Sequence, residues 1–386
     1  MKPYRFCAEA VFIDLIFKLE HNIYNSKFRG KSMKYNFAES VASELEDCPK
    51  CVAKLCKNKI KVNNTIMLNA LQNNANYSKA DFLSIKDNNV FAKPFVKWAG
   101  GKGQLLSEIH KIYPKELGHK ISKYAEPFVG GGAVLFDILN TFNLKEIYIS
   151  DVNADLINTY IMVRDNVEEV ISVLRGMDEK YKTSEQEKKK KYYYEQRDRF
   201  NLLKFNGFVD ENIEKAALFI FLNKTCFNGL YRVNKKGKFN VPIGSYKNPL
   251  ICDEKNLKIV SKLLQGIQIV CADYHESLNF IDENTFVYID PPYRPLTPTS
   301  FTAYNENSFG DEEQVELGRY IDELDHRGAF LVISNSDPKN VNENDEFFDD
   351  LYKRYDINRI DANRMINSDS KARGKIKELL VKNFEE

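Results

Sequence analysis

The segment DPPY at 290–293 combines residue types that could bind a planar amine. It follows the apolar run TFVYI (285–289), and two consecutive prolines cannot extend a central strand, so the backbone is expected to turn away there. Asp290 then offers a carboxylate, Pro291 a rigid carbonyl and Tyr293 an aromatic face. Two acceptors fit the two N–H donors of an adenine amino group. The structural alternative is a strand-ending turn with a capping aspartate.

Two glycine-rich segments could bring backbone close to a ligand. FVGGG (128–132) lies between an expected strand and helix, where glycines remove side chains and a helix N-terminus offers unpaired N–H groups. Asp151 closes the next expected strand, at the place where a carboxylate grips the ribose hydroxyls of a nucleotide-type ligand. Its alternative role is to cap the helix expected over 153–163. KWAGGK (97–102) adds a second glycine pair beside a lysine and the single tryptophan, and each segment alone could be structural.

A basic window suggests a nucleic-acid contact. Between 224 and 247 there is no acidic residue, and the basic ones are Lys224, Arg232, Lys235, Lys236, Lys238 and Lys247. The formal charge of the whole chain is only +1, so a polyanion must be held by such a local patch. Arginine is the usual partner of a guanine edge, and lysines bind phosphates. A solvated basic hairpin is the alternative.

The pattern from 93 onward predicts the elements that position these residues. KYAEPFVGGGAVLFDIL (123–139) predicts a strand, a glycine turn and a helix, and 312–328 predicts another helix. The run 146–151 predicts a second strand that ends in a carboxylate, and the short apolar runs 267–273, 285–290 and 329–335 are typical of strands buried on both faces. The fold class is therefore expected to be α/β, with a doubly wound sheet that binds ligands beyond the carboxyl ends of its strands.

This alternation of strands and helices lapses between about 164 and 254, which predicts an inserted, mainly helical domain with one helix over 188–201. We therefore expect a catalytic domain formed by 93–165 and 255–386. The inserted domain occupies 166–254, and 1–92 form an N-terminal extension of unknown role.

Composition limits the cellular compartment of the protein and the ligands that it can bind. The chain has 386 residues, 43% of them hydrophobic, and no apolar run approaches the ~20 residues of a membrane span. Seven scattered cysteines fit reduced thiols, so we expect a cytoplasmic protein without membrane contact. Cys48, Cys51 and Cys56 look like half of a zinc site, but the second pair of ligands is missing and we predict no metal.

Taken together, the motifs resemble the Dam-type DNA adenine-N6 methyltransferases, which use S-adenosylmethionine and act on GATC. The resemblance covers roughly 93–384, and its pieces stand in family order: KWAGGK (97–102), EPFVGGG (126–132), Asp151, FNGLYR to GKFNVPIG (227–244), DPPY, FTAY (301–304) and INS to RGKIKELLV (366–381). In that family the inserted segment recognises the target, and its position before DPPY matches the arrangement called class alpha. The fold implied is a Rossmann-like methyltransferase sheet.

The resemblance also implies roles for single residues. Phe227 would wedge at a base step, Arg232 would read guanine, and Leu230 with Pro242 would meet a thymine methyl. A tyrosine is common in relatives where this chain has Phe227, so a hydroxyl contact is lost. The remaining DNA-binding residues would be Asn228, Lys236 and Lys238, the flipped adenine would be held by Asp290, Pro291, Pro292 and Tyr293, and the cofactor would be held by Trp98, Gly100, Lys102, Phe128, Gly130, Gly131, Gly132, Asp151, Asp273 and Tyr274.

The expected reaction is direct methyl transfer from S-adenosylmethionine to the amino nitrogen of an adenine flipped out of double-stranded DNA. The sequence leaves other interpretations open, because the same two acceptors and aromatic face at 290–293 could bind an RNA base or a protein amide. An inactive DNA-binding relic of the fold would also keep the basic hairpin. A restriction endonuclease acting on the same site is a possible partner, if the protein belongs to a restriction-modification pair.

Overall fold

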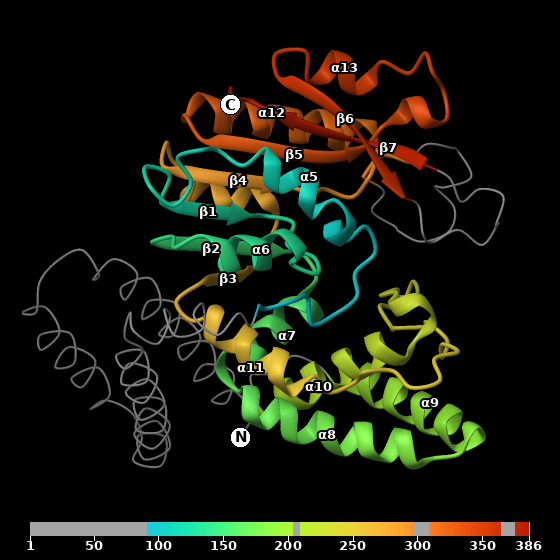
Figure 1. Ribbon diagram of the computed structural model, residues 1–386. Coiled ribbons are helices and arrows are strands. Elements are labelled where there is room, and N and C mark those ends of the chain that lie inside the picture. The colour runs from blue at the N-terminus through green and yellow to red at the C-terminus, as the bar shows by residue number, and fades with distance from the viewer. Residues whose placement is uncertain (1–90, 204–208, 296–308, 364–374, 386) are drawn as a thin grey trace, which may run out of the picture. The chain divides into compact units, whose positions relative to one another are not determined.

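The computed structural model describes residues 91–203, 209–295, 309–363 and 375–385 (Figure 1). The chain divides into two compact units, Met1–Asn76 and Tyr77–Glu386, and every described residue belongs to the second. The expectations for residues 1–90, including Cys48, Cys51 and Cys56, lie outside the described residues.

One sheet forms the centre of the second unit. Its strand order is β3-β2-β1-β4-β5-β7-β6, in which β1 to β5 run parallel, β7 runs antiparallel to β5, and β6 antiparallel to β7. This confirms the predicted α/β sheet. The strands are β1 (Lys123–Glu126), β2 (Glu146–Asp151), β3 (Gln268–Cys271), β4 (Thr285–Ile289), β5 (Phe330–Ser336), β6 (Asp356–Asn363) and β7 (Lys375–Lys382).

Each face of the sheet has its own hydrophobic core, as a doubly wound sheet requires. Phe286 and Tyr288 of β4 enter one core, whereas Val287 and Ile289 enter the other, because successive side chains of a strand alternate. The helices outside the inserted lobe are α5 (Leu106–Lys111), α6 (Ala133–Thr141), α7 (Ala154–Asp165), α11 (Glu254–Leu263), α12 (Asp311–His326) and α13 (Phe347–Leu351).

The strands predicted at 267–273, 285–290 and 329–335 are all confirmed, but only the last two are buried, so the expected burial of 267–273 is wrong. Strand β3 lies at the end of the sheet order, and its Gln268 and Cys271 are exposed. A short apolar run does not reveal whether a strand has one neighbour or two. The strands β6 and β7 were not expected, because their sequences mix polar, charged and apolar residues.

The inserted lobe is mainly helical, as expected. Helices α8 (Val167–Thr183), α9 (Gln186–Leu202) and α10 (Val209–Thr225) pack together, and α10 also packs on α7 (Figure 1). After α10 the chain forms an irregular hairpin, residues 226–244, closed by the bridges Cys226↔Ile243 and Val233↔Phe239. We call this segment the basic hairpin.

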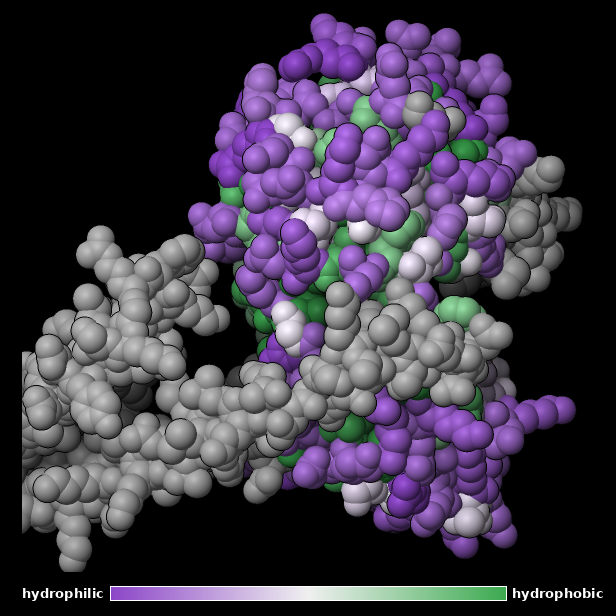
Figure 2. Space-filling model, turned by 60° about the vertical axis from the view of Figure 1, so that its left-hand side comes forward, coloured by the Kyte–Doolittle hydropathy of each residue, from purple (hydrophilic) through white to green (hydrophobic). Residues whose placement is uncertain are grey.

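On the face in Figure 2 hydrophilic side chains dominate and hydrophobic ones form small groups. Among the described residues, no helix is both long and apolar enough to cross a membrane.

The glycine turn between β1 and α6 is fixed by close packing. Gly132 has φ +70°, and a Cβ there would lie 2.5 Å from the hydroxyl oxygen of Tyr160. Gly130 has φ +47°, and its Cβ would lie 2.7 Å from Cδ1 of Trp98. Glycine is therefore required at both positions by the neighbouring aromatic rings as well as by the backbone.

We expect Gly132→Ala to destabilise the protein more than Gly100→Ala, by about 1–3 kcal/mol, because it adds a steric clash to backbone strain. Gly100 also has positive φ, +79°, but a Cβ there would meet no atom within 4 Å. Urea unfolding of both variants measures the difference. Equal losses of unfolding free energy would contradict the packing account.

Candidate active site and nucleic-acid interface

Carboxylates stand at the carboxyl ends of three adjacent strands. Glu126 ends β1, Asp151 ends β2, and Asp290 directly follows β4. The antiparallel β7 adds Glu378, which pairs in register with Ser336 at the end of β5. The sheet topology therefore brings together residues that are far apart in sequence, at the edge where ligands of such sheets bind.

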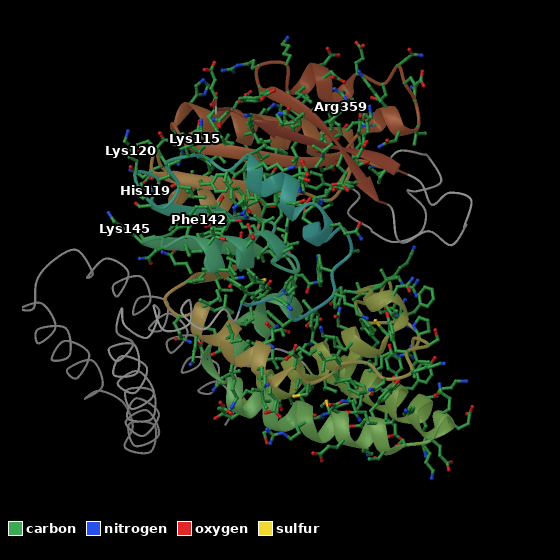
Figure 3. The ribbon with its side chains drawn as sticks, viewed as in Figure 1. Lys115, His119, Lys120, Phe142, Lys145 and Arg359 are labelled. Carbon is green, nitrogen blue, oxygen red and sulfur yellow. The ribbon has the colours of Figure 1, made fainter. Side chains whose placement is uncertain are left out.

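The opposite edge of the sheet has a different character. Lys115, His119, Lys120 and Lys145 are exposed beside the amino ends of β1 and β2 (Figure 3). The predicted catalytic residues belong to the carboxyl edge, where Asp290 follows β4.

Asp290 forms an ion pair with Lys102. The Nζ atom of Lys102 lies 2.7 Å from Oδ1 of Asp290, with the lysine side chain 3% and the aspartate side chain 20% exposed. The same ammonium donates to the hydroxyl of Tyr293 at 2.6 Å and to the carbonyl of Gly100 at 2.9 Å. Lys102, expected at the cofactor, therefore contacts the carboxylate expected to hold the substrate amine.

Tyr293 is held from two directions. Its hydroxyl donates to Oε2 of Glu378 at 2.8 Å, and its ring centroid lies 4.7 Å from Nζ of Lys102. In the structure, the predicted catalytic residues Asp290 and Tyr293 both contact Lys102. Glu378, which the sequence did not single out as a site residue, joins this group.

Burial raises the pKa of Asp290, and the negative charge of Glu378 acts in the same direction, whereas Lys102 opposes the shift. The carboxyl group therefore stands in a poorly solvated place where an N–H donor would interact strongly with its ionised form.

The turn after Asp290 is anchored by buried polar residues of other elements. Nε2 of the buried Gln314 donates to the carbonyl of Pro292 at 3.1 Å, and Oε1 of Gln314 accepts from Asn335 at 3.2 Å. Arg294, just after the turn, forms an ion pair with Asp311 at 2.6 Å. These contacts fix the backbone that carries Asp290 and Tyr293.

Asp151 closes the glycine turn. Its Oδ2 accepts from the backbone N–H of Gly130 at 3.1 Å, and its Oδ1 accepts from that of Asn153 at 2.9 Å. The cap of α7 is Asn153, whose side chain accepts from Leu156, so the alternative role of Asp151 as the helix cap is wrong. Burial raises the pKa of Asp151.

The other predicted cofactor residues fall into two groups around this turn. Phe128 stacks on the buried Tyr274 with centroids 5.3 Å apart, and Asp273 caps the short helix that begins at Tyr274. Trp98 instead stacks on Tyr231 of the basic hairpin, with centroids 6.0 Å apart.

Val152 is an exposed apolar residue beside Asp151 that sequence reasoning did not single out. It directly follows Asp151 and is 71% exposed. An apolar residue after a strand-ending carboxylate was the available signal.

The basic hairpin presents its predicted residues in different ways. Phe227 is 51% exposed and its N–H donates to the carbonyl of the exposed Pro242 at 2.9 Å, while Leu230 is half-buried. Asn228 has φ +55°, a left-handed conformation that is uncommon outside glycine. The backbone thus holds Phe227 outward beside Pro242.

Arg232 and the lysines lie farther along the hairpin. Nε of Arg232 donates to Oδ1 of Asn240 at 2.6 Å, which fixes the guanidinium across the hairpin. Lys236 and Lys238 are exposed at the tip, where Oδ1 of Asn234 accepts from both of their backbone N–H groups. Asn234 therefore orders the turn that carries these two charges.

Asn223 joins the hairpin to the segment that contains Lys102. Its Oδ1 accepts from the N–H of Lys97 at 2.7 Å, and its Nδ2 donates to the carbonyls of Lys97 at 2.8 Å and Gly229 at 3.0 Å. Sequence reasoning missed this buried residue, because its contacts with Lys97 join positions 126 residues apart in the chain.

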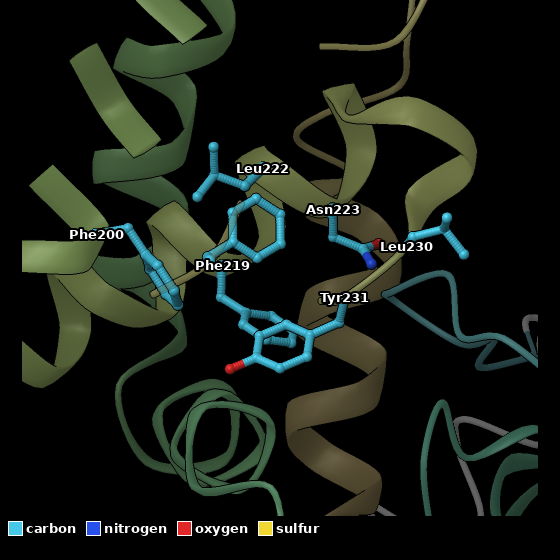
Figure 4. Close-up of a pocket in the computed structure, with 7 residues that line it drawn as sticks. Phe200, Phe219, Leu222, Asn223, Leu230 and Tyr231 are labelled. Carbon is cyan, nitrogen blue, oxygen red and sulfur yellow. The ribbon is translucent and has the colours of Figure 1, made fainter. Parts of the chain in front are cut away.

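A pocket in the helical lobe adjoins Asn223 (Figure 4). Its walls are aromatic and apolar side chains of α9, α10 and the hairpin, such as Phe200, Phe219 and Tyr231. No residue of the 290–293 turn lines it, so we regard it as a packing gap under the hairpin.

Glu126 is a buried carboxyl group at the end of β1, the strand next to the one that Asp290 follows. It accepts a hydrogen bond from the hydroxyl of Tyr124 at 2.7 Å, and burial raises its pKa well above the usual range, with a further contribution from Asp290. Its protonated form is therefore favoured in the folded protein, so its contribution to stability is complete at low pH and is lost as the pH rises through the folded-state pKa.

We expect Glu126→Gln to increase the free energy of unfolding relative to the natural protein at pH 8, and to change it little at pH 4. Chemical unfolding at both values measures this. Glu146→Gln, at an exposed position of β2, is the control and should show no such gain. A variant that is less stable at pH 8 would contradict the assignment.

Comparison with known proteins gives a consistent result. The family described as D12 class N6 adenine-specific DNA methyltransferase matches residues 98–366. The type II methyltransferase M.MjaIII of Methanocaldococcus jannaschii is 48% identical over 295 residues, which cover 76% of this chain and 99% of that protein. The type II methyltransferase M1.LlaDCHI of Lactococcus lactis subsp. cremoris is 36% identical, covering 78% and 98%. The DNA adenine methylase of Escherichia coli K12 is 34% identical, covering 75% and 94%.

Proposed function

The chain belongs to the D12 class of N6 adenine-specific DNA methyltransferases, and on that premise we propose that it methylates adenine within GATC, using S-adenosylmethionine as the methyl donor. The target adenine would be turned out of the duplex into the site at Asp290. The observation that carries this proposal is the anchored turn at 290–293, which places a partly buried carboxylate and an aromatic ring together at the carboxyl end of β4.

The turn offers the two acceptors that an adenine amino group needs. Asp290 supplies one. Pro291 supplies the other, because no donor among the described residues contacts its carbonyl, whereas the carbonyl of Pro292 is already bound to Gln314. Accepting both N–H groups directs the nitrogen lone pair toward the methyl donor, and the carboxylate stabilises positive charge as it develops on nitrogen. The extra proton then leaves to solvent, and Tyr293 stacks on the base.

The residues around the glycine turn suit the cofactor. Asp151 has its carboxylate fixed on the turn, Val152 exposes an apolar surface beside it, and the space at Gly100 is open. S-adenosylmethionine supplies a methyl group made electrophilic by a positively charged sulfur. The residues that would hold it are Trp98, Gly100, Lys102, Phe128, Gly130, Gly131, Gly132, Asp151, Asp273 and Tyr274.

The basic hairpin would bind and read DNA. Phe227 would fill the space left by the extruded base, which offsets an unstacking cost of a few kcal/mol. Arg232 would bind a guanine edge, while Leu230 and Pro242 would contact a thymine methyl group. The remaining contacts, to the backbone of double-stranded DNA, are assigned to Asn228, Lys236 and Lys238.

The names of the relatives bear on the substrate and partner of this protein. They describe DNA adenine methylases and type II methyltransferases, which supports DNA over an RNA or protein amide substrate. The type II names also support a restriction endonuclease acting on the same site as a partner.

We expect Asp290→Ala to slow adenine methylation by about 10²–10³-fold, because the developing charge loses its acceptor. Asp282→Ala, at the amino end of β4, is the matched control and should retain activity. The measurement combines methyl incorporation into unmethylated duplex, structured RNA and protein with sequencing of the methylated adenines. Incorporation into RNA or protein alone would reject the substrate, and an active Asp290→Ala enzyme would reject the catalytic role.

Arg232→Ala and Lys238→Ala should impair different properties of the protein, the first its discrimination between bases and the second its binding to DNA of any sequence. Loss of a guanine contact is expected to reduce discrimination at one base pair by roughly 1–3 kcal/mol, whereas loss of a phosphate contact weakens binding to all sequences and lowers the salt slope by about one. Methylation of all single-base variants of GATC at several salt concentrations separates the two effects. Equal discrimination by Arg232→Ala and the natural protein would contradict this role.

A further inference from the structure

Glu378 is a partly buried carboxylate that the reaction described above does not use. Its side chain is 13% exposed and belongs to β7, yet it reaches Tyr293 at 2.8 Å and lies 3.9 Å from Nζ of Lys102. Both partners belong to other segments, so this contact exists only because β7 pairs with β5.

The two carboxylates near Lys102 lie at different distances from its ammonium nitrogen. Its ammonium hydrogen-bonds to Asp290 at 2.7 Å, while Glu378 stands just beyond hydrogen-bond range. A buried ammonium that loses its partner carries a large desolvation penalty. An amine that replaces Lys102 at Asp290 therefore binds well only if the lysine has a second anion nearby, and Glu378 is that anion.

We propose that Glu378 is a positioning residue of the active site. It orients the ring of Tyr293 through the phenol hydroxyl, and it accepts the ammonium of Lys102 when the amino group of the target base takes its place at Asp290. The inference rests on the proposed function, since it assumes that a substrate amine binds Asp290.

Two substitutions separate the two roles of Glu378. Glutamine keeps an oxygen that accepts from Tyr293 but removes the charge that attracts Lys102. Alanine removes both. Lys377→Ala is the matched control, because Lys377 is the preceding residue of β7 and is exposed, and side chains of neighbouring strand residues point to opposite faces.

The experiment measures three quantities for each full-length variant: the single-turnover rate of methyl transfer to a GATC duplex, the dissociation constants for DNA and S-adenosylmethionine, and the fluorescence of 2-aminopurine placed at the target adenine. We expect Glu378→Ala to slow transfer roughly 100-fold and to alter the fluorescence. Glu378→Gln should slow transfer roughly tenfold with fluorescence like that of the natural protein. Both dissociation constants should change less than the rate, and Lys377→Ala should behave as the natural protein.

Different results would reject the role of Glu378 and the proposed function. Natural rates in Glu378→Gln and Glu378→Ala would overturn the inference, as would a loss explained entirely by weaker DNA or cofactor binding. Should Glu378→Ala fail to fold, the nearly isosteric Glu378→Gln still decides the question through its rate. Failure of the unmodified protein to methylate adenine in DNA would instead reject the proposed function.

Discussion

The buried ammonium of Lys102 is the charge on which the site depends. Removing it from water is costly unless anions surround it, and the structure supplies Asp290 at 2.7 Å and Glu378 at 3.9 Å. Tyr293 completes the group by accepting from Lys102 and donating to Glu378. Three distant segments must therefore meet correctly before the carboxylate that we assign to the substrate is in place.

The fold meets this requirement through its strand order. Parallel strands bring Asp151 and Asp290 to one edge, and the final antiparallel strand brings Glu378 to the same place. The inserted lobe is linked to this edge through Asn223, which hydrogen-bonds to both Lys97 and Gly229. A connection of this kind couples the hairpin that would read DNA to the segment that carries Lys102.

The sequence predicted the parallel strands because each is a short apolar run, and it placed Asp151 and Asp290 at strand ends. It did not show that β3 lies at the end of the sheet order with Gln268 and Cys271 exposed. It did not predict β6 and β7, since polar residues interrupt any simple pattern in 356–363. Glu378 and the pairing of Lys102 with Asp290 were missed for a related reason. Their contacts depend on which strands become neighbours, and local spacing carries no such information.

The proposed reaction depends on Asp290 binding the amino group of an extruded adenine. A crystal structure of the protein with GATC duplex and an unreactive analogue of the methyl donor tests this most directly. We expect the target adenine outside the helix, with its amino nitrogen about 3 Å from a carboxylate oxygen of Asp290. A fully engaged complex in which that adenine stays stacked while Asp290 remains paired with Lys102 would contradict it.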